Sequence, residues 1–213
     1  MTPLPPINQL ISRCRALAAL DLILSPDWQS RFYSFDSCWS QDALMASMRD
    51  GCGDEWWIVF HRSGWAALKG LGHDSPAWSL HHEKLSLALQ RSFPGDFGDF
   101  STEPAFRWSE TSFAYFHSVG ATGWTRVNDL AGYSADDAGD TQLLAHVIGR
   151  PSDYAAFARD YYETNVDERI IAGVFALHPI TGAIISALNP STSLEDISGE
   201  LYGQIQYPRT SVV

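Results

Sequence analysis

The side chains best suited to chemistry in this sequence stand in two short polar loops. Loop 49–55 and the position after it combine charges with a tryptophan: Arg49, Asp50, Asp54, Glu55 and Trp56. Loop 72–75 adds His73 and Asp74. Both loops flank a predicted β-hairpin, so we expect them at the same edge of a sheet, where binding residues often collect. A tryptophan beside fixed charges is typical of an interface hot spot, and these are the candidate binding residues. Two ordinary polar turns are the simpler alternative.

The same loops supply the candidates for an enzyme. Acid–base chemistry needs carboxylates and histidines that meet in the fold, and the best of these are Asp54, Glu55, His73 and Asp74. No nucleophile motif such as G-x-S-x-G accompanies them. Cys52 lies between two glycines, but its acidic neighbours should raise the thiol pKa, whereas a nucleophile needs a lowered one. Catalytic residues therefore stay unassigned, and the sequence leans away from an enzyme.

The histidines and cysteines do not have the spacing of metal ligands. His81 and His82 are adjacent, so on a helix they point about 100° apart and cannot easily share a metal. The acidic stretch 136–140 lacks the alternating oxygens and the terminal glutamate of a calcium loop. Gly70 and Gly72 do not form a phosphate-cradling sequence at a helix start. We therefore expect no metal and no cofactor.

The elements that must position these loops are hairpins first and helices later. Aromatic and β-branched runs around glycine turns predict β-hairpins at 56–71 and 111–127. A strand is expected at 31–39 and a short helix at 41–48. Further helices are predicted at 7–18, 80–89, 141–148 and 154–161, and a capping box from Thr192 to Glu195 begins another. The β-branched residues of 169–177 would also suit a strand, but a helix is expected there because Asp167 can cap it and helices surround it.

This order predicts an α+β fold. An antiparallel sheet built from hairpins forms its first part and is packed with helices, and the C-terminal part is mostly helical. No linker-like stretch divides the chain, so we expect a single domain over 1–213, with a sub-boundary near 129–140 as the best place for a division.

The composition narrows the classes of partner. The formal net charge is −11, which argues against nucleic acid as a partner and permits a basic protein. No stretch approaches the roughly 18 apolar residues of a membrane span, so no membrane partner is expected. Asp21 interrupts the apolar run 16–24 that would imitate a signal peptide. The interrupted run and the odd number of cysteines favour reduced thiols and a cytoplasmic location. The cysteines are Cys14, Cys38 and Cys52. The oligomeric state is not predicted.

Several short motifs resemble an uncharacterised family of bacterial cytosolic proteins. They are spread from about Arg31 to Pro208 and comprise the segments 33–39, 45–56, 103–106, 161–163, 188–190 and 206–208. That family implies no activity and no site residues. A looser likeness, in texture, is to SMI1/KNR4-type immunity proteins, which are cytosolic α+β domains, often acidic, that neutralise toxins.

Three functional hypotheses follow. The first is a protein-binding module, in particular an immunity-type inhibitor of a basic toxin, because charge complementarity speeds association with a basic partner. The second is an enzyme of unknown reaction that uses scattered carboxylates and histidines. The third is a housekeeping protein of unknown role. A flat acidic face with an aromatic rim would favour the binding module, and a concave apolar pocket holding two or more of the acid–base candidates would favour the enzyme.

Overall fold

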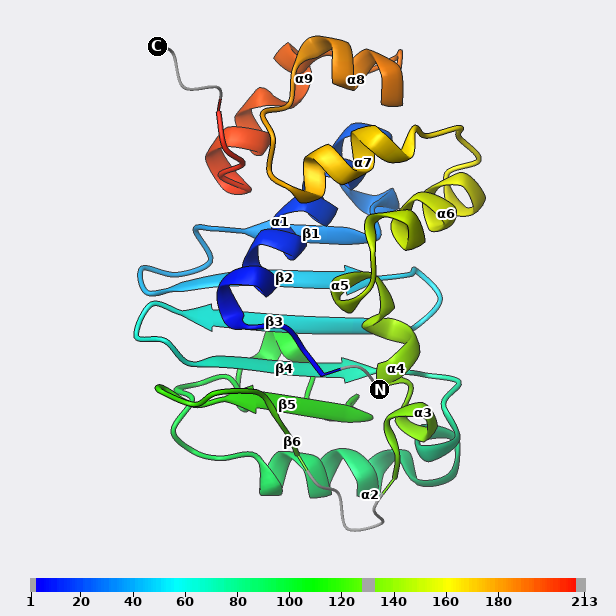
Figure 1. Cartoon of the computed structure of the whole chain (residues 1–213). Coiled ribbons are helices and arrows are strands. Elements are labelled where there is room, and N and C mark those ends of the chain that lie inside the picture. Colours follow the sequence, from blue (N-terminus) through cyan, green and yellow to red (C-terminus); the bar gives the residue numbers. More distant parts are fainter. Residues whose placement is uncertain (1–2, 128–132, 210–213) are drawn as a thin grey trace.

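The fold is built on a six-stranded antiparallel sheet. The computed structural model describes residues 3–127 and 133–209, and within them the strands lie side by side in sequence order (Figure 1). Their bounds are β1 Tyr33–Asp36, β2 Ala43–Arg49, β3 Glu55–His61, β4 Ala66–Leu71, β5 Phe113–His117 and β6 Thr125–Arg126. The described chain beyond residue 133 is mostly helical, which confirms the predicted α+β class. Part of the predicted sub-boundary, 129–132, lies outside the described residues.

The predicted helix at 41–48 is wrong, because this segment is strand β2. The segment is rich in alanine, leucine and methionine, which favour helices by only fractions of a kcal/mol per residue. Strand β2 pairs with β1 on one side and along its whole length with β3 on the other. Ladder hydrogen bonds on both sides outweigh that local preference. The two predicted hairpins are confirmed as β3–β4 and β5–β6.

Helices frame the sheet on several sides. Their bounds are α1 Ile7–Leu24, α2 Pro76–Ser92, α3 Ala135–Ala138, α4 Asp140–Leu143, α5 Ala145–Ile148, α6 Pro151–Tyr161, α7 Glu168–Phe175, α8 Gly182–Leu188 and α9 Leu194–Gly199. Asp167 caps α7 as predicted. The capping box of α9 is shifted by one residue from the prediction and is formed by Ser193 and Asp196. In the part of the chain that the structure describes, no helix has both the length and the apolar character needed to cross a membrane.

Helix α1 contributes many of the buried residues of the hydrophobic core. It lies across the β1 end of the sheet, with the C-terminal helices on its other side (Figure 1). Every residue from Ala16 to Ile23 is buried. The predicted helix 141–148 is divided into α4 and α5, which lie beside one end of the strands (Figure 1). These short helices complete the wall beside the turn between β2 and β3.

One glycine in the sheet makes room for an aromatic ring. Cross-strand pairing places Met48, Trp56, Gly70 and Phe113 in one row on the same face of the sheet. A Cβ atom on Gly70 would lie 2.1 Å from Cζ of Phe113, so the ring occupies the space that a side chain would need. Phe113 is fully buried, and side chains in a close-packed interior have little room to move.

We expect Gly70→Ala to destabilise the fold by about 1–3 kcal/mol, because the new methyl group overpacks the site of the Phe113 ring. Urea unfolding measures this. Gly182→Ala is the matched control: it lies at the start of α8 with no atom within 4 Å of the added Cβ, so its stability should be unchanged or slightly higher. A double variant, Gly70→Ala with Phe113→Leu, should recover part of the loss. Equal stability of Gly70→Ala and wild type would contradict this packing.

Candidate functional site

The turn between β2 and β3 is organised by a single carboxylate oxygen. Oδ1 of Asp50 accepts hydrogen bonds from the backbone N–H groups of Cys52, Gly53 and Asp54, at 2.7, 3.0 and 2.9 Å. Gly51 and Gly53 have φ angles of +77° and +127°, which suit glycine. The sequence D-G-C-G-D therefore closes the turn by a local side-chain-to-backbone network.

The second candidate loop docks onto this turn. Oδ1 of Asp54 accepts two hydrogen bonds from His73, one from the backbone N–H and one at the ring nitrogen Nδ1, both at 2.8 Å. Nε2 of His73 lies 3.2 Å from a carboxylate oxygen of Asp74. The structure thus brings loops 49–55 and 72–75 together at one edge of the sheet, as the hairpin between them predicts.

The two loops also meet the helices at this edge. A Cβ atom on Gly72 would lie 3.1 Å from the backbone oxygen of Ala138 and 3.2 Å from Cα of Gly139. The backbones of loop 72–75 and the α3–α4 junction therefore approach closely. This contact brings α4 and α5 up against the β2–β3 turn.

Two of the candidate residues are not on the surface. Trp56 is 1% exposed and its Nε1 donates to the backbone oxygen of Leu143 at 3.0 Å, so the expectation of a surface tryptophan at this position is wrong. Glu55 is also buried. It pairs with Arg107 and, at 3.2 Å, with Lys69. Burial lowers the pKa of Lys69 to about 8, although the charge of Glu55 acts in the opposite direction.

An exposed tryptophan does lie beside the loop, but it is Trp28. It is 54% exposed, and the guanidinium carbon of Arg49 lies 3.5 Å from the centre of its ring. Arg49 also donates to the backbone oxygen of Trp28 at 2.7 Å. The sequence places Trp28 in the connection after α1, far from loop 49–55, so spacing alone does not link the two.

A cleft of about 470 Å³ opens beside the turn, and we call it the acidic cleft. Asp50, Cys52 and Asp54 line it from the turn, and it is completed by residues of β1, β2, α4, α5 and α6 and the residue before β1: Phe32, Tyr33, Met48, Gln142, Leu143, Ala145, His146, Phe157 and Tyr161. A smaller hollow of about 210 Å³ adjoins it through Asp54 and contains Asp74 and Asp136.

Aromatic rings form one wall of the acidic cleft. The ring centres of Phe32 and Phe157 are 4.8 Å apart, and Tyr161 lies within 5.3 Å of both. Phe157 and Tyr161 are stacked, with 19° between their planes. Tyr161 is 42% exposed, so this wall reaches the surface.

The acidic cleft also contains a tyrosine–histidine pair that the sequence did not indicate. The hydroxyl group of Tyr33 lies 2.6 Å from Nδ1 of His146. Burial lowers the pKa of His146, which favours its neutral ring, and burial raises the pKa of Tyr33. The two residues are far apart in the sequence, and no motif marks either of them.

A buried carboxylate links the elements around the acidic cleft through hydrogen bonds. Oδ2 of Asp21, on α1, accepts the backbone N–H groups of Phe32 and Tyr33 at 3.0 and 2.6 Å. Oδ1 of Asp21 accepts the hydroxyl group of Tyr154 on α6 at 2.6 Å. This one side chain therefore joins α1 to two of the elements that line the cleft, β1 and α6. Burial raises the pKa of Asp21 from 3.8 to about 6, against the effect of these hydrogen bonds.

The carboxylates of the cleft retain unused hydrogen-bonding capacity. All the hydrogen bonds of the Asp50 and Asp54 side chains go to Oδ1, and Oδ2 of each has no hydrogen-bond partner among the described residues. Each carboxylate is held in place through its Oδ1 atom, so its Oδ2 atom can accept a hydrogen bond from a cation. No group of three or more histidine, cysteine, aspartate or glutamate side chains in residues 3–127 and 133–209 could hold a metal ion. Cys52 is an exposed free thiol.

Comparison of the chain with protein-family models, with curated proteins and with solved structures finds no match. The resemblances to an uncharacterised bacterial family and to SMI1/KNR4-type immunity proteins therefore stay predictions. Inferences about function rest on the geometry of the acidic cleft.

Two histidines at this edge should titrate on opposite sides of the ordinary value of 6.5. The hydrogen bond to Asp54 raises the pKa of His73, and the charge of Asp74 adds to this, whereas burial lowers the pKa of His146. NMR titration of the imidazole protons measures both. Asp54→Asn should lower the pKa of His73 and leave that of His146 nearly unchanged. A pKa of His73 below that of His146 would contradict the arrangement.

The stability of the fold should depend on the protonation of Asp21. Its pKa is 3.8 when unfolded and about 6 when folded, so folding binds a proton between these values. The corresponding stabilisation is fully present below pH 3.8 and is lost as the pH rises through 6. It amounts to about 3 kcal/mol, at 1.36 kcal/mol per pH unit.

Urea unfolding of wild type and Asp21→Asn between pH 4 and pH 7 tests this dependence. Asparagine does not titrate. The difference between the unfolding free energies of wild type and variant therefore isolates the contribution of Asp21. The difference in unfolding free energy between wild type and variant should fall by about 2 kcal/mol from pH 4 to pH 7, which is most of the full effect. Parallel pH profiles would show instead that Asp21 stays ionised in the folded protein.

Proposed function

We propose that this chain is a protein-binding module whose acidic cleft receives a lysine or arginine side chain of a basic partner protein. The observation that carries the proposal is the pairing of two pre-positioned carboxylates with an aromatic wall. Asp50 and Asp54 each have a free Oδ2, and Phe157 and Tyr161 provide ring faces in the same cleft. A cation gains from both, through charge-assisted hydrogen bonds and cation–π attraction.

The charge of the whole chain supports the same kind of partner. A net charge of −11 attracts basic proteins over a distance and speeds their encounter. A basic toxin neutralised by an immunity-type inhibitor is such a partner, and it is the specific form of the proposal that the family likeness suggests. A cytoplasmic location accords with free thiols at all three cysteines.

The arrangement supports an enzyme less well. Of the four acid–base candidates, only Asp54 lines the larger cleft, and its Oδ1 is already bonded to His73. Glu55 is buried in an ion pair with Lys69. The smaller hollow holds both Asp54 and Asp74, but it has less than half the volume of the acidic cleft. Asp54 and Asp74 thus meet only in the smaller hollow, and no two of the four candidates share the acidic cleft.

The test uses acetyl-arginine methylamide and acetyl-lysine methylamide as probes, followed by NMR. Wild type should bind them saturably, with shifts at Tyr161 and His146, and should bind acetyl-norleucine methylamide more weakly. Asp50→Asn with Asp54→Asn keeps both Oδ1 acceptors and removes both charges. This variant should bind the cations about tenfold more weakly, since each exposed ion pair contributes up to about 1 kcal/mol.

Asp96→Asn is the matched control, because Asp96 is exposed on the connector 93–100 and does not line the cleft. It should bind the probes like wild type. Added salt should weaken binding to wild type more than binding to the double variant. Cation binding that is unchanged in the double variant would overturn the proposal, as would shifts confined to other parts of the molecule.

A further inference from the structure

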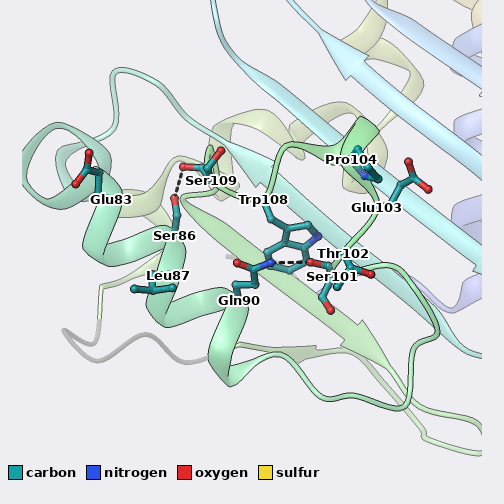
Figure 2. A pocket seen from close by; sticks show the side chains of 10 residues that line it. All are labelled: Glu83, Ser86, Leu87, Gln90, Ser101, Thr102, Glu103, Pro104, Trp108 and Ser109. Carbon is teal, nitrogen blue, oxygen red and sulfur yellow. Dashed lines mark hydrogen bonds between the residues drawn. The ribbon is translucent and has the colours of Figure 1, made fainter.

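A second concave surface lies far from the acidic cleft, between α2 and the segment 101–109 (Figure 2). It is a groove of about 520 Å³, and we call it the α2 groove. Helix α2 runs beside β5 and β6, whereas α6 of the acidic cleft lies near the β1 end of the sheet (Figure 1). The two surfaces share no lining residue.

Specific hydrogen bonds hold the two walls of the α2 groove together. Oγ of Ser86 donates to the backbone oxygens of Ser109 and Thr111 at 2.9 and 3.1 Å. Nε2 of Gln90 donates to the backbone oxygen of Ser101 at 2.8 Å (Figure 2). The groove therefore exists before any partner arrives, and binding would not have to order it.

The groove combines an apolar side chain with acidic ends. Leu87 lines it and is 46% exposed, so its side chain is accessible to a ligand. Figure 2 shows Glu83 toward one end and Glu103 toward the other, with the Trp108 ring between them. None of the ten residues that line the groove is basic.

The polar groups of the groove favour a ligand that donates hydrogen bonds. Nε1 of Trp108 already donates to the backbone oxygen of Phe100 at 2.7 Å, and Nε2 of Gln90 donates to Ser101. Oε2 of Glu103 and both carboxylate oxygens of Glu83 have no hydrogen-bond partner among the described residues. Charged acceptors are thus open at both ends, whereas Nε1 of Trp108 and one N–H of Gln90 are used within the groove walls.

We propose that the α2 groove binds a short segment of a partner protein in which an apolar side chain stands between two basic residues. The apolar side chain would pack against Leu87 and Trp108, and the two cations would pair with Glu83 and Glu103. A second copy of this chain fits less well, because it also carries a net charge of −11 and like charges repel. This binding site is independent of the acidic cleft.

The experiment titrates the full chain with a capped pentapeptide, glycine–lysine–leucine–lysine–glycine, and maps amide NMR shifts. Saturable shifts are expected along α2 and 101–109. Glu83→Gln with Glu103→Gln should weaken binding about tenfold, through the loss of two ion pairs. Glutamine keeps the Oε1 atom of residue 103 that caps the backbone N–H of Ala105, so the fold should be retained. Leu87→Ser should weaken binding by a similar factor.

Control peptides and a control variant separate the possible outcomes. Replacing leucine by glycine in the peptide, or both lysines by glutamate, should abolish most of the binding. Glu195→Gln, an exposed change on α9, should leave it unchanged. Shifts that appear only at the 50–54 turn would overturn the proposal while supporting the acidic cleft. Equal binding of the glycine-substituted peptide, or unchanged binding by the Glu83 and Glu103 variant, would also overturn it.

Discussion

The buried carboxylate of Asp21 is the interaction on which the architecture most depends. Its two oxygens accept hydrogen bonds from the start of β1 and from Tyr154 on α6, while Asp21 itself lies in the fully buried half of α1. An unpaired carboxylate in such a position would be very costly, so each of these donors must be in place. The requirement fixes the position of α1 relative to the first strand and of α6 relative to both. The aromatic wall of the acidic cleft then follows, since Phe32 belongs to the strand side and Phe157 to α6.

A second buried charge network explains why part of the candidate site serves stability instead. Glu55 is paired with Lys69 on the neighbouring strand and with Arg107 from the segment that covers this face of the sheet. Both Glu55 and Lys69 are buried, so removing Glu55 would leave Lys69 without its ion-pair partner in the core, whereas removing Lys69 would leave Glu55 paired with Arg107. Asp54, one residue earlier, points to the loop edge and bonds to His73. Asp54 thus belongs to the turn before β3 and reaches the cleft, whereas Glu55, the first residue of β3, supports the sheet.

The sequence was informative where a local pattern decides the structure. Glycine turns between aromatic and β-branched runs predicted both hairpins, and these placed loops 49–55 and 72–75 at one edge of the sheet. It failed where distant parts of the chain decide. Strand β2 carries helix-forming residues, and only its two neighbouring strands make it extended. Trp28 and His146 reach the site through the packing of α1 and of the short helices α4 and α5, which no motif encodes. Trp56 is buried where its Nε1 donates a hydrogen bond to the backbone oxygen of Leu143, which lies far along the chain.

The position of α1 between the sheet and the C-terminal helices has a consequence for synthesis on the ribosome. The strands pair with their neighbours in sequence, so the sheet can assemble from nearby segments as they emerge. Helix α1 emerges before all of them, yet part of its covering comes from α7 and α8. At a synthesis rate of 5–20 residues per second, roughly 10–30 s separate the emergence of α1 from that of α7 and α8. During that interval the apolar surface of α1 is incompletely covered, and transiently exposed surface of this kind is prone to aggregation.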